Sequence, residues 1–222
     1  MSNRKIAIVS VIVIISVFAT TKKMVLDNPV LLCKVAEGFN EPSIPFYFVL
    51  DRIYKLSSKK DFGRKLIADL SEDENRYLHE LYIRILGVIG ESEALYSLQQ
   101  TYIKNQHDEN SKVTLYYTIK SMGLMGEIEI VPFLEKLLEK YKELDVLVSG
   151  SNIAVALYLI TGKDNIYFFN SEGQMQRLVL DENLIKAKRI IATSKGRSRT
   201  LKEMIELDTR VFRPPDWRNH SF

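Results

Sequence analysis

Cysteine is nearly absent from this chain of 222 residues, which contains only Cys33. A single cysteine excludes an intrachain disulfide. Its apolar neighbours in PVLLCK favour a buried small side chain over a catalytic thiol or a lipid-anchoring residue. The chain must therefore depend on a hydrophobic core, and its apolar content of 46% is sufficient for one.

Histidine is also scarce, with His79, His107 and His220 as the only three. None has metal-ligand spacing to Cys33 or to another histidine. The polar stretch His107–Glu109 favours a solvated loop over a cation site. Glycine-rich phosphate loops, serine nucleophile elbows and zinc-protease motifs are absent as well. We therefore expect no catalytic, metal or cofactor site, and no enzyme.

Net charge is small, at +3, so no global field draws the chain to nucleic acid. The charges are nevertheless unevenly distributed. Residues 71–145 contain 14 acidic and 8 basic side chains, whereas residues 181–222 contain 6 acidic and 10 basic ones. An acidic middle region is thus followed by a basic C-terminal region.

The first 24 residues are predicted to lie outside the folded domain. Two basic residues precede the apolar run 6–20, and Lys22–Lys23 follow it. This layout is typical of a secretory leader that is cleaved after Ala19. It also fits an uncleaved membrane anchor, although a perpendicular spanning helix needs about 20 apolar residues. A buried core helix is the third alternative, whereas either of the first two places the remaining chain in the periplasm or cell envelope.

The strongest architectural signal is an internal period of 36 residues. LGVIGESEALYSL is followed by MGLMGEIEIVPFL, and both Gly87 to Gly123 and Gly90 to Gly126 are steps of 36. The next step reaches Gly162 at the end of a weaker third copy. A period of this length indicates stacked structural units, each built from one supersecondary element.

Within each unit the apolar spacing predicts two helices joined at the second glycine. Gly90 and Gly126 suit the left-handed residue that ends a helix. Gly87 and Gly123 lie inside helices, where glycine costs about 1 kcal/mol relative to alanine and marks close approach of a neighbour. Pro132 is expected in the first turn of its helix, where its missing N–H has no helical partner.

These repeated residues resemble HEAT repeats, most closely the short bacterial type related to bilin lyases. The second copy matches that pattern best, whereas the first copy has Tyr96 where the pattern has proline. The resemblance covers about residues 72–162. It implies a mostly all-α, armadillo-type α-solenoid of antiparallel helix pairs that serves as a binding surface.

The remaining chain predicts flanking elements. A possible divergent first repeat precedes the array, a hairpin or irregular cap follows Gly162, and helices are expected over 182–193 and 200–209. Pro214 and Pro215 exclude a helix at the end of the chain. The predicted organisation is a leader or anchor (1–24), N-terminal helices (25–70), HEAT-like repeats (71–165) and an irregular basic C-terminal extension (166–222).

Seven positive charges and no acid lie within residues 183–202: Lys186, Lys188, Arg189, Lys195, Arg197, Arg199 and Lys202. A solvated face that balances the acidic repeats is one interpretation. Contact with an anionic surface, such as lipid headgroups, a polymer or an acidic partner, is another. Nucleic acid is a third, but an exported chain rarely meets it.

Together these features predict an exported protein-interaction scaffold, acting as an inhibitor or immunity-type partner in the cell envelope through the concave face of the solenoid. The protein partner is not identified by the sequence, and no nucleic-acid partner is expected. Membrane contact would come from an uncleaved leader. Two alternatives are an accessory lyase-like enzyme of the bilin-lyase-like group and a module that binds an anionic polymer or membrane surface through the basic segment.

Overall fold

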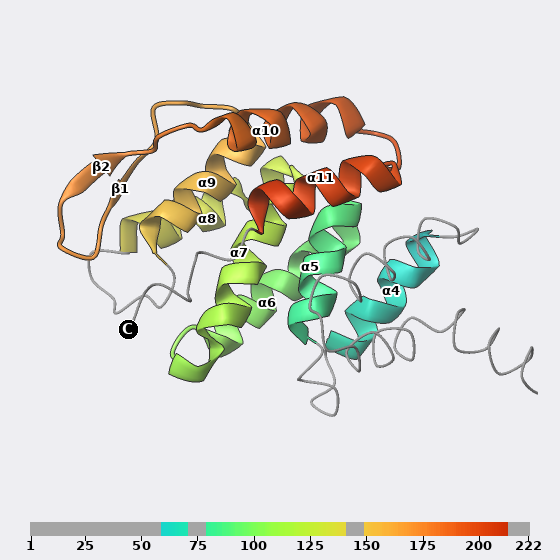
Figure 1. Ribbon diagram of the computed structural model, residues 1–222. Helices are drawn as coiled ribbons and strands as arrows, with labels where there is room; N and C mark the ends of the chain where they lie inside the picture. Colours follow the sequence, from blue (N-terminus) through green and yellow to red (C-terminus); the bar gives the residue numbers. More distant parts are fainter. Residues whose placement is uncertain (1–58, 71–78, 141–148, 213–222) are drawn as a thin grey trace, which may run out of the picture.

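The computed structural model describes residues 59–70, 79–140 and 149–212, and these are mostly helical with one small two-stranded sheet (Figure 1). The predicted mostly-α class is confirmed at this level. The helices are α4 (Lys59–Leu70), α5 (His79–Ile89), α6 (Leu95–Asn105), α7 (Lys112–Met125), α8 (Val131–Lys140), α9 (Gly150–Thr161), α10 (Glu182–Ser194) and α11 (Leu201–Val211). Short 3-10 turns precede α6, α7 and α8: η2 (Ser92–Ala94), η3 (Glu109–Ser111) and η4 (Ile128–Ile130).

Several sequence predictions concern residues outside these ranges. They are the leader at 1–24 with its cleavage after Ala19, the N-terminal helices expected before residue 57, and the environments of Cys33 and His220. Within the described ranges, no helix combines the length and apolar character needed to cross a membrane.

Helices α5, α7 and α9 lie side by side as a central layer (Figure 1). Their close approach depends on the glycines inside the helices. A Cβ on Gly87 would lie 2.8 Å from the Cα of Ser121, and one on Gly123 would lie 2.7 Å from the Cα of Ala156. Both distances are shorter than any real Cβ contact and involve backbone atoms, so the prediction that these glycines mark helix approach is confirmed.

A second layer covers one face of the central helices. Helix α4 packs on α5, α6 on α7, and α8 on α9. The ring of Tyr102 in α6 meets that of Phe133 in α8 edge-on, with centroids 5.8 Å apart. Pro132 is the second residue of α8, as the sequence predicts. The two helices expected in each of the first two repeats are therefore present.

A β-hairpin follows α9 and projects from the helical body (Figure 1). Strands β1 (Tyr167–Phe169) and β2 (Met175–Arg177) pair antiparallel, with Phe169 opposite Met175. The connector contains Gly173, whose φ of 74° requires a residue that tolerates the left-handed region. Of the two predicted forms of this segment, the structure has the β-ribbon.

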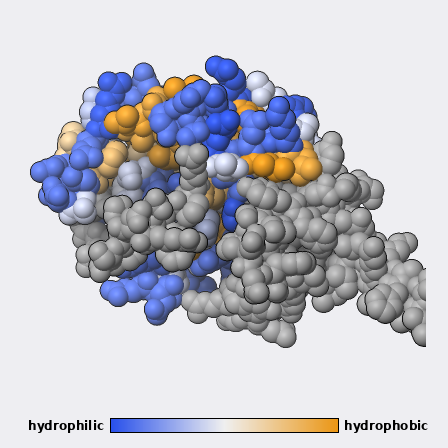
Figure 2. All heavy atoms as spheres, viewed as in Figure 1, coloured by the Kyte–Doolittle hydropathy of each residue, from blue (hydrophilic) through white to orange (hydrophobic). Residues whose placement is uncertain are grey.

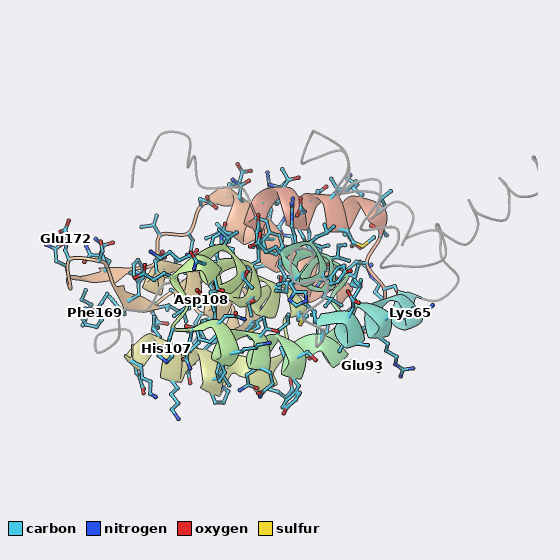
Figure 3. All side chains as sticks on the ribbon, turned by 90° about the horizontal axis from the view of Figure 1, so that it is seen from below. Lys65, Glu93, His107, Asp108, Phe169 and Glu172 are labelled. Atoms are coloured by element: carbon cyan, nitrogen blue, oxygen red, sulfur yellow. The ribbon has the colours of Figure 1, made fainter. Side chains whose placement is uncertain are left out.

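Helices α10 and α11 cover the face of the central layer that lies away from α6 and α8 (Figure 3). Asp181 caps α10 by accepting from the Leu184 N–H at 2.8 Å, and Thr200 and Glu203 form a capping box on α11. The buried face of α11 is formed by Met204, Leu207 and Val211, with Phe212 immediately after it.

The helices expected over 182–193 and 200–209 are present as α10 and α11, and their packing on the central layer is what the sequence analysis did not predict. Residues 182–211 are two capped helices whose apolar side chains belong to the same core as α5, α7 and α9. Core residues Ala187 and Ile191 are interspersed among the basic residues of this segment, so its high positive charge hides its apolar face in the sequence.

Candidate functional site

The central helices end at the same side of the molecule, below α10 and the turn that follows it. Each ends in a glycine with positive φ: 74° at Gly90, 73° at Gly126 and 74° at Gly162. The prediction that Gly90 and Gly126 end helices is thereby confirmed. A Cβ on Gly126 would also lie 2.6 Å from a methyl group of Ile191 in α10, so a larger residue there meets both strain and collision.

Arg199 joins the ends of two central helices. Its Nη1 donates to the carbonyls of Gly87 at 2.9 Å and Val88 at 3.0 Å, and its Nη2 donates to that of Leu124 at 2.6 Å. Its Nε donates to the hydroxyl of Ser194 at 3.2 Å. The carbonyls of a last helical turn have no helical partner and carry negative partial charge, so a cation stabilises them.

Burial lowers the pKa of Arg199 to about 10, while Glu203 and Glu127 act in the opposite direction. The side chain therefore stays charged at neutral pH. Because Arg199 is only 5% exposed, its guanidinium is not presented to an external surface. The expectation that Arg199 contacts an anionic surface is corrected on this ground: its charge serves the helix ends inside the protein.

Lys188 has the same role at the third central helix. Its ammonium donates to the carbonyls of Leu159 at 2.9 Å and Ile160 at 2.7 Å, in the last turn of α9. Burial lowers the pKa of Lys188, and repulsion from Lys195 lowers it further. Two cations of the basic segment thus neutralise the carbonyl ends of three helices.

The other five basic residues are more exposed. Arg197 forms a bidentate pair with Glu203, and Lys186 pairs with Glu182. Lys202 lies 4.0 Å from Glu206. The side chains of Arg189 and Lys195 are exposed and have no hydrogen bond or ion pair with the described part of the chain. Figure 2 shows strongly hydrophilic surface along α10 at the top of the molecule.

A cleft of about 270 Å³ opens at this convergence of helix ends. Four of the seven predicted residues line it: Lys188, Lys195, Arg197 and Arg199. The other three, Lys186, Arg189 and Lys202, do not. Among the described residues that line the cleft, Glu127 is the only acid, and Gly90, Gly126 and Gly196 contribute backbone to its wall.

A second polar cluster, which the sequence does not predict, fixes α11 to the central layer. Arg84 of α5 donates to both carboxylate oxygens of Asp208 at 2.5 and 2.6 Å, and Asp208 is 2% exposed. Burial raises the pKa of Asp208, and Arg84 opposes that change. The sequence holds one signal for this pair, since Asp208 stands four residues after Met204 and three before Val211, on the apolar face of its helix.

Lys120 of α7 belongs to the same region. Its ammonium donates to the hydroxyl of Tyr116 at 2.8 Å and to the carbonyl of Val211 at 2.7 Å. Burial lowers the pKa of Lys120 to about 8. This lysine therefore satisfies a carbonyl in the last turn of α11, as Arg199 and Lys188 do for the central helices.

The histidines do not form a metal site within the described residues, where no group of three His, Cys, Asp or Glu side chains is placed to hold an ion. His79 packs beside Tyr82 with ring centroids 6.4 Å apart. His107 and Asp108 lie in the turn after α6 (Figure 3). There the Asp108 carboxylate accepts from the Asn110 N–H and the Ser111 hydroxyl, which makes it a cap of η3.

Comparison of the chain with known protein families, with curated proteins and with solved structures gave no match.

Proposed function

We propose that this chain is an exported helical-repeat protein of HEAT type, with an α-solenoid arrangement, that binds another protein in the cell envelope. The period of 36 residues supports the repeat assignment, because Gly90 and Gly126 have equivalent conformations at equivalent helix ends. The proposal of export depends on the sequence of residues 1–24. The proposal of protein binding depends on the surface next to the hairpin.

Four apolar side chains are exposed on that surface. Tyr167, Met175, Val179 and Ile185 are 53%, 64%, 83% and 43% exposed, respectively. They make up half of the large, strongly exposed hydrophobic side chains in the described ranges, and they fall within 19 residues. We call these four residues the hairpin patch. The strand register places Tyr167 and Met175 diagonally across the hairpin. Exposed apolar side chains that gather in this way mark sites of protein interaction.

A groove runs beside the hairpin patch, between α8, α9 and the start of β1. Its volume is about 580 Å³. Leu138, Leu157 and Ile166 supply apolar walls, Glu135 and Lys163 lie among the lining residues, and Tyr167 belongs to both groove and patch. Strand β2 pairs only with β1, so its other edge is open in the described sheet. The apolar walls of the groove suit apolar side chains of a partner. The open edge of β2, which does not line the groove, suits pairing with an extended segment.

The position of this surface changes the expected mode of binding. Helices α10 and α11 cover one face of the central layer, so that face is not open to a partner (Figure 3). The hairpin patch lies at the edge of the array, where β1 packs on α9. An inhibitor or immunity-type role would place the hairpin against the partner that it occludes.

The test is capture of the partner from envelope extract by the full chain. We expect Met175→Asp combined with Val179→Asp to abolish capture of a stoichiometric partner, because two charges would be buried in an apolar interface. Tyr96→Asp is the matched control, since Tyr96 is 69% exposed on α6, away from the hairpin. Equal capture by both variants would contradict the proposal.

The enzyme alternative predicts a different result. An accessory lyase of the bilin-lyase-like group would turn over a small molecule in the absence of a stoichiometric partner. The alternative of an anionic polymer or membrane surface rests mainly on the outward-facing Arg189, Lys195 and Lys202. It predicts binding that weakens with salt, since exposed charges are screened.

A further inference from the structure

We propose that the cleft at the ends of α5, α7 and α9 binds a small phosphate-class anion between Lys188 and Lys195. This site is separate from the hairpin patch and does not depend on the proposed protein partner. Its ligand could be free phosphate, a small phosphorylated molecule or a phospholipid headgroup, which share the same chemistry.

The charge of the cleft is the first argument. Arg197 is paired with Glu203, which leaves Lys188, Lys195 and Arg199 against the single carboxylate of Glu127. The described lining is therefore basic. Because Lys188 and Arg199 also donate to helix-end carbonyls, Lys195 supplies the charge that is not taken up within the described cleft. A phosphate group combines negative charge with three acceptor oxygens, so it can accept hydrogen bonds from more than one of these donors.

The available donors are the second argument. A lysine ammonium has three N–H donors, and Lys188 uses two of them on the carbonyls of Leu159 and Ile160. Lys195 uses none on the described part of the chain. Both side chains line the same cleft, and the charge of Lys195 lowers the pKa of Lys188. An anion between them would relieve that repulsion and accept hydrogen bonds from both.

The surrounding helix ends would repel an anion if their carbonyls were unpaired. Here Arg199 and Lys188 already donate to five of these carbonyls. Because Arg199 and Lys188 neutralise the helix ends, Lys195 is the cleft cation that has no partner within the described protein. The basic segment therefore has two parts, one that stabilises the fold and one that faces the cleft.

The size of the cleft limits the ligand. A volume of about 270 Å³ lies near the lower end of small-molecule sites, which begin at about 300 Å³. It accommodates a phosphate with a small substituent but not a length of polymer. Glycines at positions 90, 126 and 196 keep side chains out of the space.

The experiment measures binding of inorganic phosphate to the full chain by calorimetry, with thermal unfolding as a second readout. We expect saturable binding that raises the melting temperature. Lys195→Gln should weaken phosphate binding by about tenfold, because one charged hydrogen-bond donor is lost. Lys202→Gln is the matched control, since Lys202 is exposed on the same segment but lies outside the cleft lining.

Lys195 is exposed, so its substitution should leave the melting temperature without phosphate unchanged, and weak binding by that variant cannot be attributed to misfolding. Absence of saturable phosphate binding by the unsubstituted chain, or equal binding by the Lys195 and Lys202 variants, would overturn the proposal. The Met175→Asp and Val179→Asp variant should bind phosphate normally, which separates failure of this site from failure of the hairpin patch.

Vesicles distinguish the sources of the phosphate group. Sedimentation with phosphatidylglycerol vesicles that is lost in Lys195→Gln and displaced by inorganic phosphate would assign the cleft to a lipid headgroup. Phosphate binding without such sedimentation would assign it to a soluble ligand. Vesicle binding that falls equally in the Lys195 and Lys202 variants, without competition by phosphate, would indicate diffuse attraction and contradict a defined site.

Discussion

Single residues in this protein have roles that follow from their surroundings rather than from their type. Arg197 and Arg199 are two positions apart, yet one pairs with Glu203 at the surface and the other is buried among backbone carbonyls. The difference arises because the chain turns at Gly196, whose φ is 79°, and enters α11 at Thr200. A cluster of basic residues in a sequence therefore does not by itself predict a basic surface, because some of these side chains can be buried.

Replacement of Arg199 by methionine tests this role. We expect the free energy of unfolding to fall by about 2–4 kcal/mol, because three buried carbonyls would lose a charged donor. Chemical denaturation provides the measurement. Arg189→Met, on the exposed face of α10, should change stability by less than about 0.5 kcal/mol. A similar effect for both variants would refute the assigned role of Arg199.

At the scale of elements, the packing of α7 on α9 depends on Gly123. Gly123→Ala would gain up to about 1 kcal/mol of helix propensity. The added methyl would lie 2.7 Å from the Cα of Ala156, which cannot move without shifting α9. Overpacking of this kind costs about 1–3 kcal/mol, so we expect net destabilisation.

Thermal unfolding of Gly123→Ala checks the expectation, and Gly173→Ala serves as its control. Unlike Gly123, Gly173 has a positive φ of 74°, and a Cβ there would have nothing within 4 Å. The Gly173→Ala variant therefore measures the effect of backbone strain on stability in the absence of a steric clash. A Gly123→Ala variant more stable than the unsubstituted protein would show that the two helices can separate without cost.

The attachment of α11 to α7 makes stability depend on pH. The pKa of Lys120 is about 8 in the folded protein and 10.5 without burial, so between these values only the unfolded chain retains the proton. Stability should therefore rise from about pH 8 towards pH 10. Burial raises the pKa of Tyr102 to about 12 and also that of Tyr116, so above pH 10 these groups ionise first in the unfolded chain and stability should fall.

Denaturation at a series of pH values measures this profile. Lys120→Met removes the titrating group, and its stability should rise less between pH 8 and pH 10 than that of the unsubstituted chain. Lys188 contributes in the same direction, because burial also lowers its pKa, so some rise should remain. An identical rise in both proteins would exclude Lys120 as its source.

At the scale of the whole molecule, local features could be predicted and long-range ones could not. The spacing of apolar residues and the cap signals predict α7, the hairpin and the helix-ending glycines, because each depends on residues close in sequence. The pairs Arg84 with Asp208 and Arg199 with Gly87 span 124 and 112 residues. No periodicity connects such positions, so composition and spacing could not predict that α10 and α11 pack on the central layer.

The candidate site was likewise predictable in part. The cluster of basic residues in 183–202 was visible in the sequence, and four of its members do line one cleft. Which of them faces inward depends on where α10 crosses the ends of α5, α7 and α9. The hairpin patch was visible only as a predicted ribbon, because exposure of Tyr167 and Met175 depends on how β1 packs on α9.

The placement of α10 and α11 has a consequence for the order in which the chain can fold during synthesis. The carbonyl ends of α5 and α7 are satisfied by a residue made 112 and 75 positions later, respectively. A nascent chain that has emerged only to α9 therefore exposes the apolar face that Met204, Leu207 and Val211 later cover. Such surfaces are prone to association until the native partner arrives. The protein should reach its native state only after the whole segment up to Phe212 has entered the compartment in which the chain folds.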